Sequence, residues 1–430
     1  MKKTLAILLS LVMVFALVSA SAYAEPTDET LTVWCWDESF NIAAMKTAAK
    51  YYQAAGHENF SLNIVDVVED DVMTKLATAF SAGVTEELPD IVLMGDSWAK
   101  MYLVNYAGCF VDLTDNIDFS EFAPYKVSCF TVDDRVYGIP FDSGSAGLFY
   151  RTDILEQAGY TAEDLKDITI WDFLEIGKAI KEKTGNYAIA IDPSSGCGFT
   201  WFDSYQQSSG EWFYDANDPE ENADFANNQV VRELSEFLKE ACQSGIVYRT
   251  ETANSATINA IQDGEVACVL NAIWYAPSIM GDQSAAGKWS YTNVPTLTTV
   301  ETSKYTNIGG SSWTILSTSE KQDLAIDFMK TVWAGNKEFY DEILLGQSAV
   351  ATWLPASDSD VYNTPVEFFS GKPLYADFAS WGANIPSVDF GSNTWTVNGA
   401  VNGTLADYVD GIVDLDTYLE NLQSAYDTMK

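Results

Sequence analysis

The stretch LTVWCWDESFNIAAMKTAAKYYQAAGHENFSLNIVDVV, residues 31–68, decides the fold. Residues 31–36 form an apolar, β-prone run, and residues 40–55 repeat apolar side chains at helical spacing. Gly56 then stops the helix, and residues 61–68 return to a strand pattern. A strand, a helix and a strand in so short a span predict two parallel strands joined by a helical crossover.

The same alternation continues beyond this stretch. A helix is predicted up to Gly83 and a buried strand over residues 89–94, which extends the parallel sheet. Ser319–Gln322 reads as a capping box that opens a helix reaching Trp333. Further helices are predicted over about 172–183, 228–244 and 257–263. A mature chain of about 400 residues exceeds a single core of ordinary size, so two domains are expected.

The composition favours a binding protein over an enzyme. The chain holds 13 tryptophans but a single histidine, His57, which lies in a turn between a helix and a strand. One turn histidine gives little scope for acid–base chemistry, whereas a tryptophan offers a flat ring and one N–H donor. A sugar stacks its C–H face on such a ring and seeks polar partners for its hydroxyls, so a carbohydrate is the expected ligand.

The charge and the N-terminus indicate which partners are excluded and where in the cell the protein is expected. With 23 basic and 62 acidic residues the formal net charge is −39, which disfavours nucleic acid and anionic membranes as partners. Lys2 and Lys3, an apolar run over 5–18 and the small residues of Ala22-Tyr23-Ala24 predict a signal peptide over residues 1–24. The mature protein is therefore expected to be extracellular, associated with the cell surface or periplasmic, although no lipid-anchor cysteine follows the cleavage site.

No metal or cofactor is predicted. The six cysteines contain no C-x-x-C pair, so a zinc ribbon is disfavoured, and both disulfides and buried free thiols stay open. The acidic cluster over residues 215–221 lacks the glycine and the spacing of an EF-hand loop, so a polar turn is expected there.

Several sequence blocks in order carry a resemblance to a known family. They lie at residues 31–34, 88–92, 137–140, 148–153, 171–174, 199–201, 262–267 with Trp274, and 309–310. In this order and spacing the mature chain resembles the extracellular solute-binding proteins (family 1) of sugar ABC importers, the group that includes maltose-binding protein.

The resemblance implies an α/β, two-lobed periplasmic-binding-protein-like fold, with a hinge and a ligand cleft between the lobes. Lobe one would comprise residues 25–139 plus 297–335, and lobe two residues 140–296 plus 336–430. The carboxyl ends of parallel strands would then face the cleft.

Polar candidates for ligand contact follow three strands. They are Trp36, Asp37 and Glu38 after the first strand, Asp96, Ser97 and Trp98 after the third, and Asp142 and Ser143 after the first crossover. Resembling proteins place an acidic residue against sugar hydroxyls in the first and last of these positions. The alternatives are helix caps for the first two groups and a hinge turn for the third.

Aromatic candidates come from later in the chain. Trp274 lies where resembling proteins stack a ring on sugar, Trp395 resembles their C-terminal stacking position, and Trp313 lies where the chain should return to the cleft. A core position is the alternative for each.

The function expected from the resemblance is capture of a neutral carbohydrate, an oligosaccharide, and its delivery to the permease subunits of an ABC importer by a monomeric protein. Arg151 is the one basic residue close to the candidate loops, which disfavours anionic ligands. Two alternatives remain: a cationic ligand such as a polyamine, and a freestanding carbohydrate-binding protein. A glycosidase is disfavoured, although paired carboxylates in an aromatic cleft are compatible with one.

Overall fold

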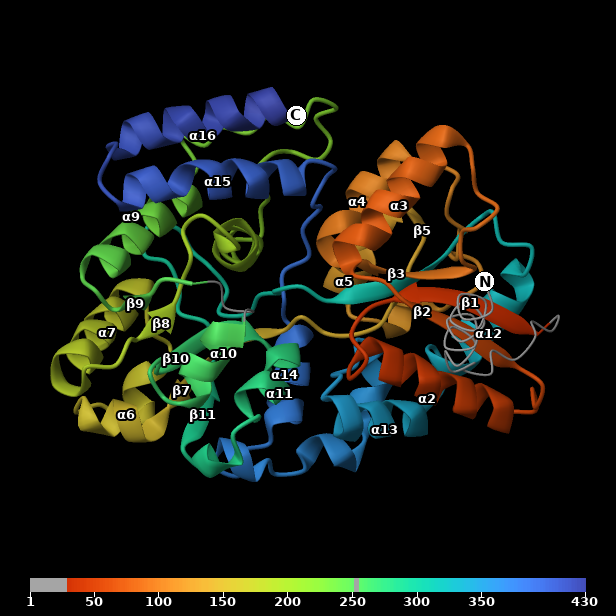
Figure 1. Cartoon of the computed structure of the whole chain (residues 1–430), viewed down its shortest axis with the longest axis horizontal. Helices are drawn as coiled ribbons and strands as arrows, with labels where there is room; N and C mark the ends of the chain where they lie inside the picture. The colour runs from red at the N-terminus through yellow and green to blue at the C-terminus, as the bar shows by residue number, and fades with distance from the viewer. Residues whose placement is uncertain (1–28, 251–254) are drawn as a thin grey trace, which may run out of the picture.

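The protein folds into two lobes that lie side by side (Figure 1). The structure is a computed structural model that describes residues 29–250 and 255–430. The predicted signal peptide over residues 1–24 lies outside the described residues. Within the described ranges, no helix combines the length and the apolar character that a membrane span needs.

The first lobe is built on a five-stranded sheet in the order β2-β1-β3-β12-β6. Strand β1 lies between β2 and β3 and parallel to both, which confirms the predicted start of the sheet. Strand β12 runs antiparallel to β3, and β6 antiparallel to β12. The strands are β1 (Thr30–Cys35), β2 (Ser61–Asp66), β3 (Ile91–Gly95), β12 (Ser311–Ile315) and β6 (Ile139–Pro140), and a small hairpin pairs β4 (Thr131–Val132) with β5 (Arg135–Val136).

Helices of 6 to 14 residues cover this sheet. Their bounds are α2 (Asn41–Ala54), α3 (Glu69–Ala82), α4 (Asp96–Asn105), α5 (Pro124–Cys129), α12 (Gln322–Val332) and α13 (Lys337–Gln347). Both α12 and α13 pack on α2, so segments far apart in sequence close one core. Because α4 begins directly after β3, its first residues lie at the carboxyl edge of the sheet.

The second lobe holds a three-stranded antiparallel sheet with β7 in its centre. Its strands are β7 (Ala146–Arg151), β10 (Cys268–Ala272) and β11 (Trp289–Thr292), with a parallel pair of β8 (Ile189–Ala190) and β9 (Val247–Tyr248) beside β10. Its helices are α6 (Thr152–Gln157), α7 (Ile170–Thr184), α8 (Ser204–Ser208), α9 (Gln229–Gln243), α10 (Ser255–Gln262), α11 (Ala276–Ile279), α14 (Leu374–Gly382), α15 (Thr394–Val409) and α16 (Leu415–Met429). A π-helical turn, Gly198–Asp203, leads into α8.

Three segments of the chain run side by side between the lobes. Isolated bridges pair Asp142 with Ala351 and Ser145 with Asn307, so the segments after β6, before β12 and after α13 touch one another. Gly144 allows this close approach, because a Cβ there would lie 2.2 Å from Asn307 Oδ1 and 2.5 Å from the Gly309 carbonyl oxygen. These segments are where a hinge was predicted.

Two predicted lobe boundaries differ from the structure. Helix α13 was assigned to lobe two by the boundary at residue 336, but its apolar face packs on α2 in the first lobe. Residues 297–308 were assigned to lobe one, yet Leu297 packs in the core of the second lobe and Thr306 Oγ1 donates to the Ser204 carbonyl oxygen. The crossover therefore begins near residue 308.

The predicted capping box at residues 319–322 is wrong. Helix α12 begins at Gln322 after Lys321, and no side chain caps its first turn. The Ser319 hydroxyl instead donates to Asp90 Oδ1 at the start of β3, a partner distant in sequence.

All six cysteines lie in the described residues as free thiols, four of them buried. The acidic cluster forms the expected polar turn, in which Asp215 Oδ1 accepts from the Asn217 amide and Asp218 Oδ1 from the Glu220 amide.

Candidate functional site

The residues after β1 serve the start of α2. Asp37 adopts φ = 64° and its Oδ1 accepts from the amides of Ser39 at 3.0 Å and Phe40 at 3.1 Å. Glu38 is exposed and pairs with Lys46, while Trp36 is half-buried beside the core of the first lobe. Asp37 thus stabilises the turn that precedes α2, which has no side-chain cap. None of the three predicted residues lines the two cavities described below.

The residues after β3 do reach the space between the lobes. Asp96 is buried and both its carboxylate oxygens accept from Lys126 Nζ at 2.7 Å. Burial raises the pKa of the Asp96 carboxyl, and the ammonium of Lys126 opposes that rise. Asp96 and Ser97 line a small cavity between the lobes, and Trp98 packs against the second lobe.

The crossover residues Asp142 and Ser143 are both buried and engaged within the hinge. Asp142 Oδ1 accepts from the Ser311 amide at 2.9 Å and from the Ser311 hydroxyl at 3.0 Å. The Ser143 hydroxyl lies 3.2 Å from the Tyr125 hydroxyl and accepts from the Ser145 amide at 3.1 Å. Neither lines a cavity between the lobes, so both fit the hinge alternative instead of the predicted ligand contact.

Trp313 lies in the core of the first lobe and not at the cleft, which fits the core alternative instead of the predicted ligand contact. It lies on β12 with none of its surface exposed, packed between Phe141 and Trp333 with ring centroids 5.7 and 5.6 Å away. All five residues of β12 are buried, and the Trp313 ring packs in the core of the first lobe.

Trp274 lies directly after β10 and lines a cavity of about 220 Å³, here called the side cavity. Its Nε1 donates to the Ile308 carbonyl oxygen at 2.8 Å, which fixes the ring against the crossover. The side cavity is lined by residues 190–192, 195–197, 199–201, Asn271, Trp274 and Ile308. Half-buried aromatic and polar groups here form a surface of the kind on which a sugar ring stacks.

A stack of three rings crosses between the lobes. Trp98 of α4 lies on Trp395 of α15 with centroids 4.3 Å apart and an interplanar angle of 26°. Trp395 lies parallel to Phe199 at 6.4 Å, with an angle of 9°. The Nε1 atoms of Trp98 and Trp395 are buried and have no hydrogen-bond partner within residues 29–250 and 255–430.

The cavity between the lobes, here called the central cavity, has a volume of about 20 Å³. It is lined by Asp96, Ser97, Phe199, Asp203, Gln207, Trp212, Asn307, Gly309, Phe390 and Thr394. That volume accommodates about one water molecule. The lobes are therefore closed on each other, and a ligand would reach these residues only when the lobes move apart.

Two polar side chains that line the central cavity, Asp203 and Asn307, and Asn398 beside Asp203 were missed by the sequence analysis. Asp203 Oδ2 accepts from Asn398 Nδ2 at 3.0 Å, and Asn307 Nδ2 donates to the Gly309 carbonyl oxygen at 2.7 Å. Oδ1 of each of these three side chains is buried and lacks a partner in the described part of the chain. Burial raises the pKa of the Asp203 carboxyl well above its ordinary value.

The sequence carried little signal for these three residues. Asp203 begins a stretch that reads as polar turns, and Asn398 lies 195 positions away. Only the block at residues 199–201, which carries Phe199, pointed to this part of the second lobe.

Neither cavity is lined by a basic residue. Among the described residues that surround the side and central cavities there is no lysine, arginine or histidine, while Asp96, Asp192 and Asp203 contribute carboxyl groups. Such a lining offers hydrogen-bond acceptors and aromatic faces but no charged partner for an anion.

Comparison with known proteins gives consistent findings. A family model described as "Bacterial extracellular solute-binding protein" matches residues 46–369. The chain is 39% identical over 382 residues to a lactose-binding protein of Rhizobium radiobacter, covering 89% of this chain and 88% of that protein. It is 24% identical over 288 residues to an arabinooligosaccharide-binding protein of Bacillus subtilis (strain 168), covering 64% and 63%.

Among solved structures, one similar chain is the ABC transporter associated binding protein of B. animalis subsp. lactis Bl-04 in complex with beta-1,6-galactobiose. The TM-score is 0.73 at 22% identity, and the match covers 92% of this chain and 96% of that chain. This likeness confirms the predicted two-lobed α/β fold.

Proposed function

The chain belongs to the bacterial extracellular solute-binding proteins, and from that premise we propose that it captures a neutral oligosaccharide between its lobes and delivers it to the permease subunits of an ABC importer. Membership of this family confirms that the protein is a binder and not an enzyme. Export by the predicted signal peptide and action as a monomer outside the cytoplasm are parts of the proposal.

The observation that carries the proposal is the pairing of aromatic rings with unpartnered acceptors at one place. Phe199 and Trp274 line the side cavity with aromatic rings, while Asp203 at the central cavity and its neighbour Asn398 each hold a buried oxygen without a partner among the described residues. Sugar hydroxyls donate hydrogen bonds to such oxygens, and the C–H face of the same ring stacks on an aromatic side chain.

The closed lobes supply the mechanism of capture. A ligand that touches both lobes favours the closed arrangement by the contacts it makes only there. The central cavity is too small for a sugar in the present arrangement, so binding requires opening at the hinge segments and reclosure around the ligand.

A neutral ligand fits the cavity lining better than a charged one. No basic side chain is available for an anion among the residues that line the two cavities. The relatives do not support the cationic alternative, because their names specify lactose and arabinooligosaccharides.

The test is a titration of residues 25–430 with lactose, beta-1,6-galactobiose, arabinooligosaccharides, monosaccharides and a polyamine. Tryptophan fluorescence and thermal shift are followed together, with Trp171→Phe as the control because Trp171 bonds Glu233 away from both cavities. A saturable response to one of the oligosaccharides, with an increase in melting temperature, is expected. A response to the polyamine alone would overturn the proposal.

Delivery has a separate test. The sugar-loaded protein should stimulate ATP hydrolysis by its reconstituted ABC importer, and the sugar-free protein should do so less. Equal stimulation with and without sugar would contradict delivery while leaving capture intact.

A further inference from the structure

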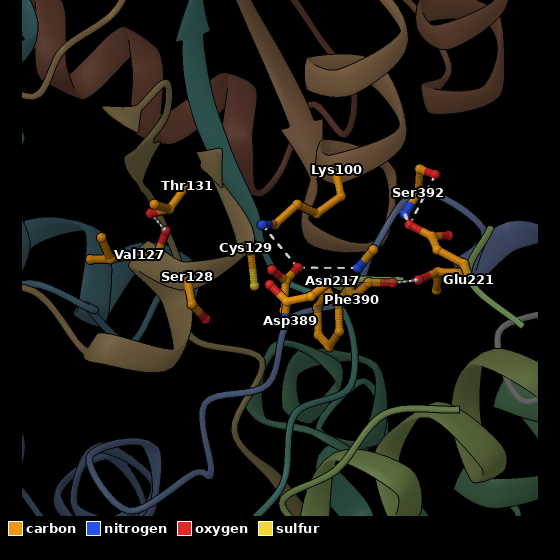
Figure 2. A network of polar contacts seen from close by, with 12 residues as sticks. Lys100, Val127, Ser128, Cys129, Thr131, Asn217, Glu221, Asp389, Phe390 and Ser392 are labelled. Atoms are coloured by element: carbon orange, nitrogen blue, oxygen red, sulfur yellow. Dashed lines mark hydrogen bonds and ion pairs between the residues drawn. The ribbon is translucent and has the colours of Figure 1, made fainter. Parts of the chain in front are cut away.

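An ion pair joins the two lobes beside the central cavity. Lys100 of α4 places its Nζ 2.8 Å from Asp389 Oδ1 in the segment before α15 (Figure 2). The Lys100 side chain is only 9% exposed, whereas that of Asp389 is 52% exposed. Every other ion pair found within residues 29–250 and 255–430 connects groups of the same lobe.

The segment that carries Asp389 is held rigidly by the second lobe. The Glu221 carboxylate accepts from the Ser392 amide at 2.7 Å, and from the Asn393 amide at 2.9 Å and its Nδ2 at 2.8 Å. Gly391 has φ = 58°, and a Cβ there would lie 2.5 Å from Tyr214. Asp389 is thus presented to Lys100 at a fixed position, which lowers the entropy cost of forming the pair.

The same two elements carry the interlobe ring stack. Trp98 lies one half-turn before Lys100 on α4, and Trp395 begins α15 just after the segment held by Glu221. Any movement that separates Trp98 from Trp395 therefore also separates Lys100 from Asp389. An opening that moves α4 away from α15 would break the ion pair.

We infer that Lys100 and Asp389 are positioning residues that hold the lobes closed and so raise ligand affinity without touching the ligand. Neither residue lines the side or the central cavity, so neither contacts a sugar there. An interaction made only in the closed form shifts the equilibrium towards it and strengthens binding by the same factor, as long as the closed form is not already dominant.

The location of the pair makes it sensitive to salt. Lys100 and Asp389 line a surface groove of about 780 Å³ between the lobes, so dissolved ions reach the half-exposed carboxylate. Screening weakens exposed charge pairs as ionic strength rises. The affinity for a neutral sugar should then fall with salt, and this fall should vanish when Lys100 loses its charge.

The experiment measures dissociation constants by calorimetry between 50 and 500 mM NaCl, together with the radius of gyration by small-angle scattering. Lys100→Met and Asp389→Asn are compared with Lys178→Met, which removes a lysine paired within the second lobe. We expect each of the first two variants to weaken binding about threefold to tenfold at low salt and to show no salt dependence. Without ligand, both should be more expanded than the wild type, and Lys178→Met should match it.

The outcomes separate this inference from the proposed function on which it rests. If a sugar binds and the Lys100 and Asp389 variants keep the wild-type affinity, salt response and radius of gyration, the inference is overturned. If no sugar binds, the proposed function fails, and scattering alone tests whether the ion pair holds the lobes closed. An expanded Lys100→Met variant supports that role, and an unchanged one overturns it. A salt dependence that persists in Lys100→Met would point to a charged ligand.

Discussion

The two lobes meet at one cleft but treat their polar groups there in opposite ways. In the first lobe, Asp96 is paired with Lys126 and Asp142 accepts from Ser311, so both carboxylates are satisfied by side chains or backbone of the protein itself. In the second lobe, Asp203 and Asn398 bond each other yet each leaves one buried oxygen without a partner in the described structure. A satisfied surface is stable alone, whereas an unsatisfied one costs stability until a ligand supplies donors.

This difference assigns different roles to the lobes. We expect changes at the edge of the first lobe to alter stability or closure, and changes in the second lobe to alter recognition. Measuring both stability and affinity for each variant distinguishes an effect on stability or closure from an effect on recognition.

The largest effect is expected in the core of the first lobe. Trp313→Ala should lower the free energy of unfolding by about 3–5 kcal/mol, because the fully buried ring packs against Phe141 and Trp333 and would leave a cavity. Urea unfolding measures the loss, and calorimetry on the folded variant should show an affinity within about twofold of the wild type. An affinity loss of tenfold or more with little loss of stability would place Trp313 at the ligand.

The next effect concerns the second lobe. Asp203→Asn should weaken sugar binding by about tenfold to a hundredfold, because the amide group replaces one acceptor oxygen with a donor, and a buried polar group left without a partner costs about 1–3 kcal/mol. Asp215→Asn, at an exposed turn, is the matched control and should bind normally. Calorimetry checks both, and equal affinity for Asp203→Asn and the wild type would break the comparison between the lobes.

The same variant should gain stability at neutral pH. Burial raises the pKa of Asp203 above its unfolded value, so its contribution to stability is fully present below the unfolded pKa, near 4, and is lost as pH rises towards the folded pKa. Melting temperatures of Asp203→Asn and the wild type should therefore converge at low pH and diverge at neutral pH, with the variant higher. A variant that is less stable at neutral pH would show that the ionised carboxylate is stabilised by its surroundings.

A smaller effect is expected from removing the ring of Trp274 in the side cavity. Trp274→Ala should weaken binding by about tenfold, since stacking adds roughly 0.5–1.5 kcal/mol beyond the area that the ring buries. Trp274→Phe keeps a ring but loses the bond to the Ile308 carbonyl oxygen, so it should recover part of the affinity. Calorimetry with the sugar identified in the panel measures both, and an unchanged affinity for Trp274→Ala would exclude the side cavity from the site.

Local patterns predicted the first half of the fold well. Strands β1, β2 and β3 and the helices between them were readable because each signal lies within a dozen residues. The capping box failed for the opposite reason, because the Ser319 hydroxyl donates to Asp90, which lies 229 positions away, and accepts from the Lys321 amide and not from the Gln322 amide.

Contacts between residues distant in sequence also limited the prediction of the site. Trp313 was misassigned because sequence does not show which face of β12 meets the core. Asp203 was missed because its role depends on its burial and on its hydrogen bond with Asn398, and the sequence around it reveals neither. Trp98 and Trp395 were both named as ligand residues, but their stacking on each other required the docked lobes.

The smallest effect is expected at the end of β1, where the first lobe was predicted to bind sugar with a carboxylate. Asp37→Asn keeps an acceptor for the amides of Ser39 and Phe40, and asparagine tolerates φ = 64°, so the melting temperature should hardly change. Because Asp37 already accepts hydrogen bonds in the turn before α2, the affinity for sugar should stay within about twofold of the wild type. Calorimetry with the same sugar decides the matter, since a tenfold loss would mean that the carboxylate meets the ligand in the liganded form and that both lobes share in recognition.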